Sequence, residues 1–124
     1  MAKILVIDDE KEIVNLYDYF LSKQKFKVLT ATNGEDGLNI AKKEIPDLIL
    51  LDVMMPGMDG GEIAQILLKN LRTKNIPIIF LTGIITQEEE AEDQKGIGRR
   101  LFLSKASKIS EVLKKINEVL EIGI

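Results

Sequence analysis

Polar residues that can take part in chemical reactions follow four apolar segments of the sequence, each near the point where the segment ends. Asp8 and Asp9 follow "KILVI", Asp52 follows "LILL", Thr82 follows "IIFL", and Lys105 comes shortly after "RLFL". Three carboxylates brought together repel one another, and a hard divalent cation such as Mg²⁺ relieves that repulsion. A hydroxyl and an ammonium beside them can bind an anion. The set favours phosphoryl transfer, in which a carboxylate can itself be the nucleophile.

Each of these residues also has an ordinary structural explanation when it is taken alone. Two aspartates after a strand commonly form a solvated turn or a helix cap, and a threonine or lysine there is commonly a cap or a solvated charge. Asp52 is explained equally well by capping of the loop that follows it. The joint occurrence of these residue types at four segment ends is what favours a site.

Five short apolar segments are expected to be strands, and amphipathic stretches alternate with them. The segments are Lys3–Ile7, Lys27–Ala31, Leu48–Leu51, Ile78–Leu81 and Arg100–Leu103. Three of them are apolar almost throughout, as expected for parallel strands that are covered on both faces. The alternation predicts an α/β fold with five β–α repeats and one doubly wound parallel sheet. Ligands bind beyond the carboxyl ends of the strands in such sheets, where the polar set falls.

Apolar residues at helical spacing indicate a helix after each strand. The first helix is expected to bury Ile13, Leu16, Tyr17, Phe20 and Leu21. Asn33 is the expected N-cap of the second helix, since asparagine accepts hydrogen bonds from a first helical turn. Thr86 with Glu89 forms a capping box that predicts the start of the fourth helix.

Composition excludes several classes of function. The 124-residue chain contains neither cysteine nor histidine, which rules out disulfides, thiolate or imidazole metal sites and Ser-His-Asp triads. Any metal must therefore have oxygen ligands. A net charge of −3 provides no basic excess for direct nucleic-acid binding. The apolar runs are too short for membrane insertion and the start resembles no signal peptide, so we expect a cytoplasmic protein.

Four motifs, "VIDDE", "LLDVMMPGMDG", "LTG" and "FLSK", resemble in order and spacing those of the response-regulator receiver domains of two-component signalling. The resemblance covers essentially the whole chain and implies a flavodoxin-like fold with strand order 2-1-3-4-5. It implies that Asp52 is the phosphoacceptor, that Asp9 is a direct Mg²⁺ ligand and that Asp8 is an outer partner of the metal. The backbone carbonyl of Met54 is implied as a further ligand, and Mn²⁺ as an alternative metal.

The resemblance also assigns roles to residues near the acceptor. Thr82 and Lys105 are expected to bind phosphoryl oxygens, and Phe102 falls at the position of the switch aromatic. Phosphorylation would then remodel the face built by the fourth helix, the fifth strand and the fifth helix. Met54 and Ile84, two residues after the acceptor and the switch hydroxyl, flank the path of the attacking water. Neither side chain can orient a water strongly, so we expect slow self-dephosphorylation.

The function implied is a phosphorylation-activated signalling switch, which is no enzyme beyond its own phosphoryl transfer and slow autodephosphorylation. The expected donor is a sensor histidine kinase or a phosphotransfer protein, and the expected output is an unidentified protein target. A homodimer formed on phosphorylation is a further expectation. Since the sequence ends after its fifth helix, we expect one receiver domain over residues 1–124 without an output domain, or a fragment of a longer regulator.

Two departures from the family pattern keep alternatives open. Ala106 stands where most members have proline, often after a cis bond. A cis bond before alanine costs about 2.5–4 kcal/mol, so a trans bond is the alternative. With a trans bond, the sequence does not decide whether Lys105 reaches the acceptor. "QKGIGRRLFL" departs from the usual pattern on the signalling face. A degenerate receiver that binds partners constitutively is therefore one alternative. A small phosphatase with an aspartyl nucleophile is another, although Met54 stands where such enzymes need an acid.

Overall fold

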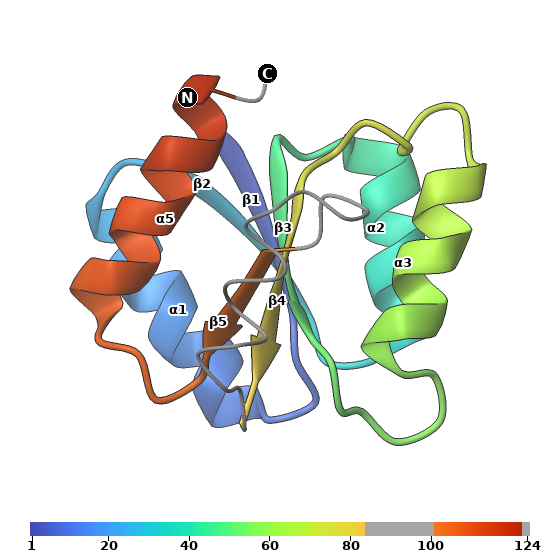
Figure 1. Ribbon diagram of the computed structural model, residues 1–124, viewed down its shortest axis with the longest axis horizontal. Coiled ribbons are helices and arrows are strands. Elements are labelled where there is room, and N and C mark those ends of the chain that lie inside the picture. The colour runs from blue at the N-terminus through green and yellow to red at the C-terminus, as the bar shows by residue number, and fades with distance from the viewer. Residues whose placement is uncertain (84–100, 123–124) are drawn as a thin grey trace.

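A computed structural model of the chain describes residues 1–83 and 101–122 (Figure 1). Its five strands are β1 (Lys3–Ile7), β2 (Lys27–Ala31), β3 (Leu48–Asp52), β4 (Ile78–Thr82) and β5 (Leu101–Ser104). They form one parallel sheet in the order β2-β1-β3-β4-β5. The predicted α/β fold and its strand order are confirmed.

The strand bounds differ from the predicted ones at three ends. β3 and β4 each run one residue further than predicted, so that Asp52 and Thr82 are the last residues of their strands. β5 ends at Ser104, and Arg100, its predicted first residue, lies outside the described residues. In the sheet ladder Asp52 pairs with Leu81, so the acceptor candidate is held by the backbone of β4.

Helices cover both faces of the sheet. Described are α1 (Lys11–Lys23), α2 (Gly34–Glu44), α3 (Gly60–Lys69) and α5 (Ile109–Ile122). Figure 1 shows α1 and α5 on one face and α2 and α3 on the other. The predicted fourth helix, with its capping box at Thr86 and Glu89, lies outside the described residues. Among the described residues, no helix has both the length and the apolar character that a membrane span requires.

The sequence predicted the N-terminal cap of α2 correctly, but it predicted the buried face of α1 only in part. Asn33 caps α2 as predicted, because its side-chain oxygen accepts a hydrogen bond of 2.8 Å from the backbone N–H of Asp36. The predicted buried face of α1 is wrong at Leu16, whose side chain is 49% exposed. Val14 is buried in its place, because α1 packs on the sheet through a line of residues turned slightly from the predicted stripe.

The core consists of two apolar layers, one on each face of the sheet. Ile4, Val6, Leu48 and Leu50 pack against α1 and α5. Their strand neighbours, including Leu5, Ile7, Ile49 and Leu51, pack against α2 and α3. Successive side chains of a strand point to opposite faces, and here both faces are covered. Coverage of both faces explains why three of the strands are apolar almost throughout.

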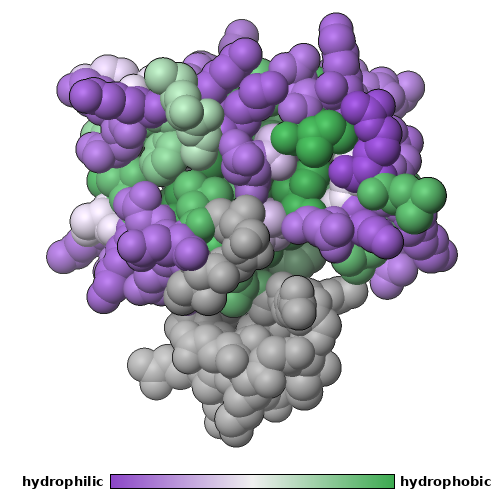
Figure 2. Space-filling model, turned by 90° about the horizontal axis from the view of Figure 1, so that it is seen from above, coloured by the Kyte–Doolittle hydropathy of each residue, from purple (hydrophilic) through white to green (hydrophobic). Residues whose placement is uncertain are grey.

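The amino edge of the sheet carries contacts of a structural kind. Figure 2 views the molecule from this side and shows mostly hydrophilic side chains with hydrophobic ones between them. Lys3 donates its backbone N–H to Asp47 Oδ2 at 2.8 Å, and its ammonium lies 3.5 Å from Glu44 Oε1. These contacts tie β1 to the end of α2 and to the turn before β3.

Candidate functional site

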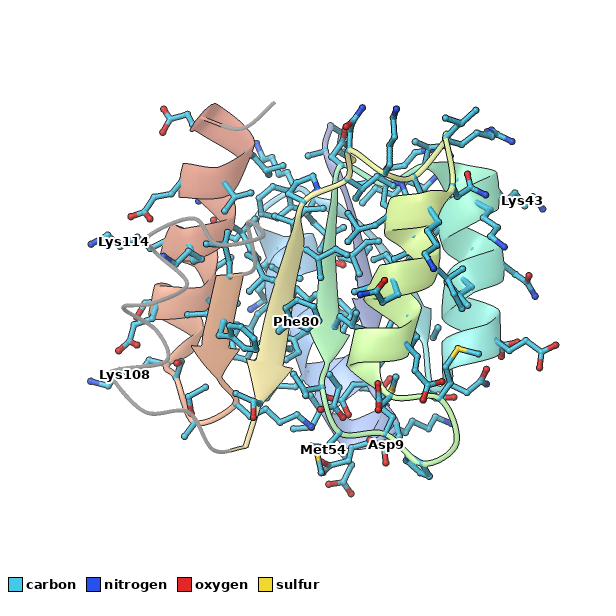
Figure 3. The ribbon with its side chains drawn as sticks, turned by 45° about the vertical axis from the view of Figure 1, so that its right-hand side comes forward. Asp9, Lys43, Met54, Phe80, Lys108 and Lys114 are labelled. Carbon is cyan, nitrogen blue, oxygen red and sulfur yellow. The ribbon has the colours of Figure 1, made fainter. Side chains whose placement is uncertain are left out.

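The candidate residues meet at the carboxyl edge of the sheet, opposite the edge just described. Figure 3 shows Asp9 and Met54 at this edge, where the arrows of the strands end. Backbone hydrogen bonds fix the segments that leave it. Asp8 donates its N–H to the carbonyl of Ala31 at 3.1 Å, and Lys105 donates to the carbonyl of Thr82 at 2.8 Å.

Strand alternation explains which side chains come together. Asp8 comes two residues after Val6 and Asp52 two residues after Leu50, and both apolar residues face α1 and α5. Because alternate residues of a strand share a face, the two carboxylates emerge on the same side of the sheet. Lys105 comes two residues after Leu103, whose side chain is buried on that side as well.

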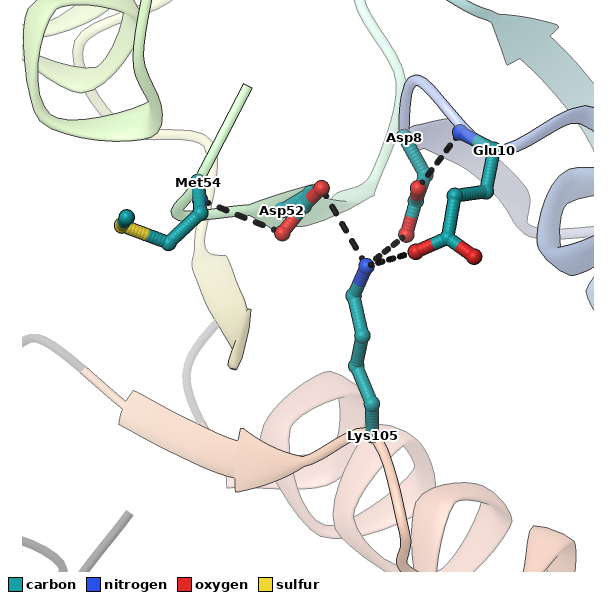
Figure 4. A network of polar contacts seen from close by, with 5 residues as sticks. All are labelled: Asp8, Glu10, Asp52, Met54 and Lys105. Atoms are coloured by element: carbon teal, nitrogen blue, oxygen red, sulfur yellow. Dashed lines mark hydrogen bonds and ion pairs between the residues drawn. The ribbon is translucent and has the colours of Figure 1, made fainter. Parts of the chain in front are cut away.

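The ammonium of Lys105 lies at the centre of this cluster (Figure 4). Its Nζ is 2.9 Å from Asp8 Oδ2, 3.2 Å from Asp52 Oδ2 and 3.3 Å from Glu10 Oε1. The side chains of Asp8 and Asp52 are 0% and 2% exposed, and that of Lys105 is 17% exposed. One half-buried cation therefore neutralises buried carboxylates from two strand ends.

The two buried carboxylates are held in the same way. Asp8 Oδ1 accepts a hydrogen bond of 2.9 Å from the backbone N–H of Glu10, and Asp52 Oδ1 accepts one of 3.2 Å from the N–H of Met54. In each case the donor is two residues further along the chain, as in the turns that aspartate side chains commonly form. One oxygen of each carboxylate is thus fixed, and the other oxygen faces Lys105.

The cluster shifts the proton equilibria of its members. Burial, and then the charge of Asp8, raises the pKa of Asp52 from 3.8 to about 6, although Lys105 opposes the shift. Burial lowers the pKa of Lys105, but the carboxylates of Asp8 and Asp52 outweigh it and raise that pKa overall. Lys105 is therefore cationic at neutral pH. Asp52 is mostly ionised there, but it is less stable as an anion than a solvated carboxylate.

The donor atoms at this edge fit a hard divalent cation. Carboxylate oxygens of Asp8, Asp9 and Glu10 lie within 4.8 Å of one another. Oδ2 of Asp8 and Oδ2 of Asp52 are buried, and in the described part of the chain neither has a hydrogen bond, only its ion pair with Lys105. Buried anionic oxygens without hydrogen bonds are costly, and oxygen ligands of this kind suit Mg²⁺.

Glu10 is the member of the cluster that the sequence analysis missed as a site residue. It contacts Lys105 and lies close to both Asp8 and Asp9. The signal was present in "VIDDE", where a third acid follows the aspartate pair. Its contact with a lysine from the far end of the chain could not be read from that motif.

Replacement of proline by Ala106 does not keep Lys105 from the site. No peptide bond in the described ranges is cis, so the bond between Lys105 and Ala106 is trans. Lys105 nevertheless reaches Asp8 and Asp52. Ser104 supports this turn, because its hydroxyl accepts a hydrogen bond of 3.0 Å from the N–H of Ala106.

Thr82 and Phe102 lie beside the cluster on the neighbouring strands. Thr82 is the half-buried last residue of β4, and it pairs with Ser104 of β5 in the ladder. The ring of Phe102, also half-buried, stacks on Phe80 with 5.1 Å between centroids and 24° between planes. The switch roles of Thr82 and Phe102 stay predictions. Ile84, the second residue predicted to modulate dephosphorylation, lies outside the described residues.

Close packing fixes the loop after Asp52. The Pro56-Gly57 pair is typical of the centre of a type II turn, and Gly57 has φ of +82°, a value that favours glycine. Gly60 begins α3 and packs against the end of β3, where an added Cβ would lie 2.5 Å from the backbone oxygen of Asp52. The Gly60 N–H also donates to the carbonyl of Val53 at 3.0 Å. The acceptor candidate therefore sits on a closely packed backbone.

Comparison with known proteins places this arrangement in context. A family model described as the response regulator receiver domain matches residues 4–117. Protein PilH of Pseudomonas aeruginosa is 37% identical over 122 residues, which cover 97% of this chain and 98% of PilH. The alkaline phosphatase synthesis transcriptional regulatory protein PhoP of Bacillus subtilis is 38% identical, but this chain spans only 48% of its length.

Solved structures agree with the sequence relatives. The Vibrio cholerae chemotaxis protein CheY4 aligns with a TM-score of 0.84 and 32% identity, covering 96% of this chain and 98% of that one. The N-terminal domain of a response regulator receiver protein from Methanoculleus marisnigri aligns with a TM-score of 0.74 and 32% identity, covering 97% of each chain. Both alignments extend over nearly the whole chain.

Proposed function

The chain belongs to the response regulator receiver domain family of two-component signalling, and from this premise we propose that it is a switch set by phosphorylation of Asp52. Receiver domains are signalling switches rather than conventional enzymes, and they generally interact with histidine kinases or phosphotransfer proteins. The observation that carries the proposal is the 3.2 Å contact between Asp52 and the ammonium of Lys105. A buried carboxylate beside a cation that can bind an anion supports the role of Asp52 as the nucleophile.

The proposed reaction is attack by a carboxylate oxygen of Asp52 on the phosphorus of a partner's phosphohistidine. A P–O bond to Asp52 forms while the P–N bond of the donor breaks. The bonding electron pair stays on the donor's imidazole nitrogen, which is protonated from water. This chain has no histidine, so the phosphohistidine belongs to the partner. Lys105 donates to a phosphoryl oxygen and stabilises the charge that develops during transfer.

We propose that Mg²⁺, or Mn²⁺ as an alternative, is held by the carboxylates of Asp8, Asp9 and Asp52 and by the backbone carbonyl of Met54. When bound, the cation supplies neutralisation of the phosphoryl oxygens and of the acidic cluster. The fit rests on the oxygen donors of the cluster and on the two buried oxygens without hydrogen bonds. Asp8 also orients the site itself, because it pairs with Lys105 and fixes the start of α1 through the N–H of Glu10.

The proposed output is a change at the face that includes β5 and α5. The hydroxyl of Thr82 donates to a phosphoryl oxygen, and Phe102 changes its packing against Phe80 as Thr82 moves. A phosphoryl group adds nearly two negative charges and new acceptor oxygens, which is sufficient to bias a surface between two arrangements. The reader of that surface is a protein partner or a second copy of this chain.

Neither alternative function is favoured by an observation. The constitutive binding module was suggested by Ala106, yet Lys105 reaches the carboxylates across a trans bond. The phosphatase alternative needs an acid at Met54, whose apolar side chain is instead 74% exposed. Transcriptional regulation is stated for PhoP as a whole, and this chain spans about half of that protein, so that activity is not carried over. A cytoplasmic location stays a prediction.

Intact-protein mass after incubation with acetyl phosphate tests the proposal. Wild type should gain one phosphoryl group in the presence of Mg²⁺ and none after chelation. The adduct should be lost in Asp52→Asn and retained in Asp36→Asn, a matched control at an exposed aspartate of α2. Absence of an adduct in wild type, with acetyl phosphate and with phosphohistidine donors, would contradict the proposed function.

A further inference from the structure

Among the residues that the structure describes, three carboxylates contact Lys105, and of these only Glu10 faces solvent. Its side chain is 61% exposed, whereas those of Asp8 and Asp52 are 0% and 2% exposed. The contact between Lys105 Nζ and Glu10 Oε1, at 3.3 Å, also has the geometry of a hydrogen bond. The contacts with Asp8 Oδ2 and Asp52 Oδ2 are shorter, at 2.9 and 3.2 Å, and they lie on the buried side of the ammonium. Glu10 therefore holds the ammonium from the solvent side of the cluster, where it occupies one of the donor groups of Lys105.

Glu10 stands at the N-cap position of α1, but its side chain does not cap the helix. At this position a side-chain oxygen commonly accepts a hydrogen bond from the first helical turn. Its carboxylate makes no capping bond, although its backbone carbonyl accepts from the N–H groups of Ile13 and Val14. Figure 4 shows the side chain turned toward Lys105 instead. The orientation of Glu10 is thus explained by the lysine and not by the helix.

The ammonium has three N–H groups, and three carboxylates surround it. A phosphoryl oxygen that is to be bound by Lys105 must compete with one of them. Asp8 is the costly one to release, because a buried charge that loses its partner is strongly destabilising. Glu10 is the one that water can solvate, since most of its side chain is exposed. The exchange of partners therefore involves Glu10.

We infer that Glu10 is a positioning residue that holds Lys105 in the unphosphorylated protein and thereby slows acceptance of the phosphoryl group. The inference rests on the proposed function of Asp52, and it adds a residue that regulates the reaction through its lysine. Glu10 acts twice: it occupies an N–H of Lys105, and its negative charge repels an incoming anionic donor. Its release into solvent accompanies the turn of Lys105 toward the phosphoryl oxygen.

Phosphorylation by acetyl phosphate at saturating Mg²⁺ tests this role, with the rate constant read from intact mass. Glu10→Gln should react about two- to fivefold faster than wild type, the range expected from loss of one exposed ion pair. Glu12→Gln is the matched control, because Glu12 is an exposed acid in the same first turn of α1. It should react at the wild-type rate. Equal rates for the two variants would overturn the inference.

A double-mutant cycle shows whether the effect passes through Lys105. In a Lys105→Met background, Glu10→Gln should no longer accelerate the reaction, whereas a purely general charge effect would persist there. Persistence of the full acceleration would therefore overturn the inference. A second result would also overturn the inference: Glu10→Gln reacts at the wild-type rate at saturating Mg²⁺ but needs a higher Mg²⁺ concentration. That result would mean that Glu10 acts on the metal and not on the lysine.

The ion pair can also be measured without any phosphorylation. In metal-free protein the ¹⁵N resonance of the Lys105 ammonium should move in Glu10→Gln and stay in place in Glu12→Gln. An unmoved resonance in Glu10→Gln contradicts the inference whether or not Asp52 is phosphorylated. Wild type that takes up no phosphoryl group from any donor contradicts the proposed function instead, so the two failures are distinguishable.

Discussion

The ammonium of Lys105 lies 3.2 Å from Oδ2 of Asp52, although β4 separates the strands that carry them. The long side chain of Lys105 crosses the end of β4 to reach the last residue of β3. It is anchored at its base, where its own N–H donates to the carbonyl of Thr82 at 2.8 Å. The side chain and backbone contacts of Lys105 thus connect the ends of β3, β4 and β5.

Asp52→Asn should stabilise the metal-free protein at neutral pH. The folded-state pKa of Asp52 is raised from 3.8 to about 6, so its ionisation opposes folding as pH rises through this window. That shift corresponds to roughly 3 kcal/mol, and we expect a gain of about 1–3 kcal/mol in the free energy of unfolding at pH 7. Urea unfolding in EDTA measures it.

The same experiment has a pH signature. Well below pH 3.8, the ordinary pKa, Asp52 is protonated in both the folded and the unfolded state, so the gain from Asp52→Asn should fade as pH falls from 6 through 3.8. Asp36→Asn, at an exposed position, should show no such trend. A gain that is constant across this range would mean that burial of the Asp52 charge is not its source.

Lys105→Met should destabilise the metal-free protein at pH 7. It leaves the buried carboxylates of Asp8 and Asp52 without their shared cation, and removal of one member of a buried ion pair is strongly destabilising. We expect a loss of about 2–4 kcal/mol, and a smaller loss when Mg²⁺ is saturating. Lys108→Met, at an exposed lysine of the same turn, is the control. Equal stabilities of the two variants would contradict the importance of this cluster.

Gly60→Ala should disturb the acceptor strand, whereas Gly61→Ala should not. A Cβ at Gly60 would lie 2.5 Å from the backbone oxygen of Asp52 and 2.9 Å from Cα of Val53, so α3 or the end of β3 must move. At Gly61 the nearest atom is 3.3 Å away, in the side chain of Asp59. We expect Gly60→Ala to lose about 1–3 kcal/mol of unfolding free energy and to be phosphorylated more slowly. Thermal unfolding and adduct formation report the two effects.

Met54→Asn should shorten the lifetime of the phosphorylated state. The Met54 side chain is 74% exposed beside the acceptor and offers no strong hydrogen bond to a water. A polar side chain there can orient the attacking water, so loss of phosphate should become severalfold faster at unchanged stability. Met54→Leu is the apolar control. Indistinguishable decay rates for the two variants would show that the side chain at position 54 does not control the lifetime of the phosphorylated state.

Thr82→Ala should separate phosphorylation from the switch. The ring of Phe102 stacks on Phe80 at 5.1 Å, so a change in its packing alters ring-current shifts in NMR spectra. Wild type should show altered Phe102 signals on phosphorylation, whereas Thr82→Ala should form the adduct with smaller changes. Identical shifts in the two proteins would show that the hydroxyl of Thr82 does not couple Asp52 to Phe102.

The sequence predicted the sheet and its site because both depend on short-range features. Apolar runs with a charged residue at their ends specify a buried parallel strand, and parallel strands bring their carboxyl ends to one edge. Alternation along β1 and β3 then decides that Asp8 and Asp52 share a face. These rules need only a few neighbouring residues, and the bounds of β1 and β2 follow them. The strand order was implied instead by the resemblance to the receiver family.

Features that depend on distant contacts were beyond the sequence. The contact between Glu10 and Lys105 could not be predicted, because it depends on where β5 ends. Leu16 was assigned to the core because its spacing fits a helical stripe, but the rotation of α1 against the sheet buries Val14 in its place. The reach of Lys105 across a trans bond could likewise be decided only from the folded chain.

The most direct test of the account is chemical mapping of the phosphorylated residue. Wild type treated with acetyl phosphate and Mg²⁺ is reduced with borohydride, which converts an aspartyl phosphate into homoserine and releases phosphate. Peptide mass spectrometry should then find homoserine at position 52 and at no other aspartate. Homoserine at Asp8 or Asp9, or an adduct that resists reduction, would contradict the assignment of Asp52 as the acceptor.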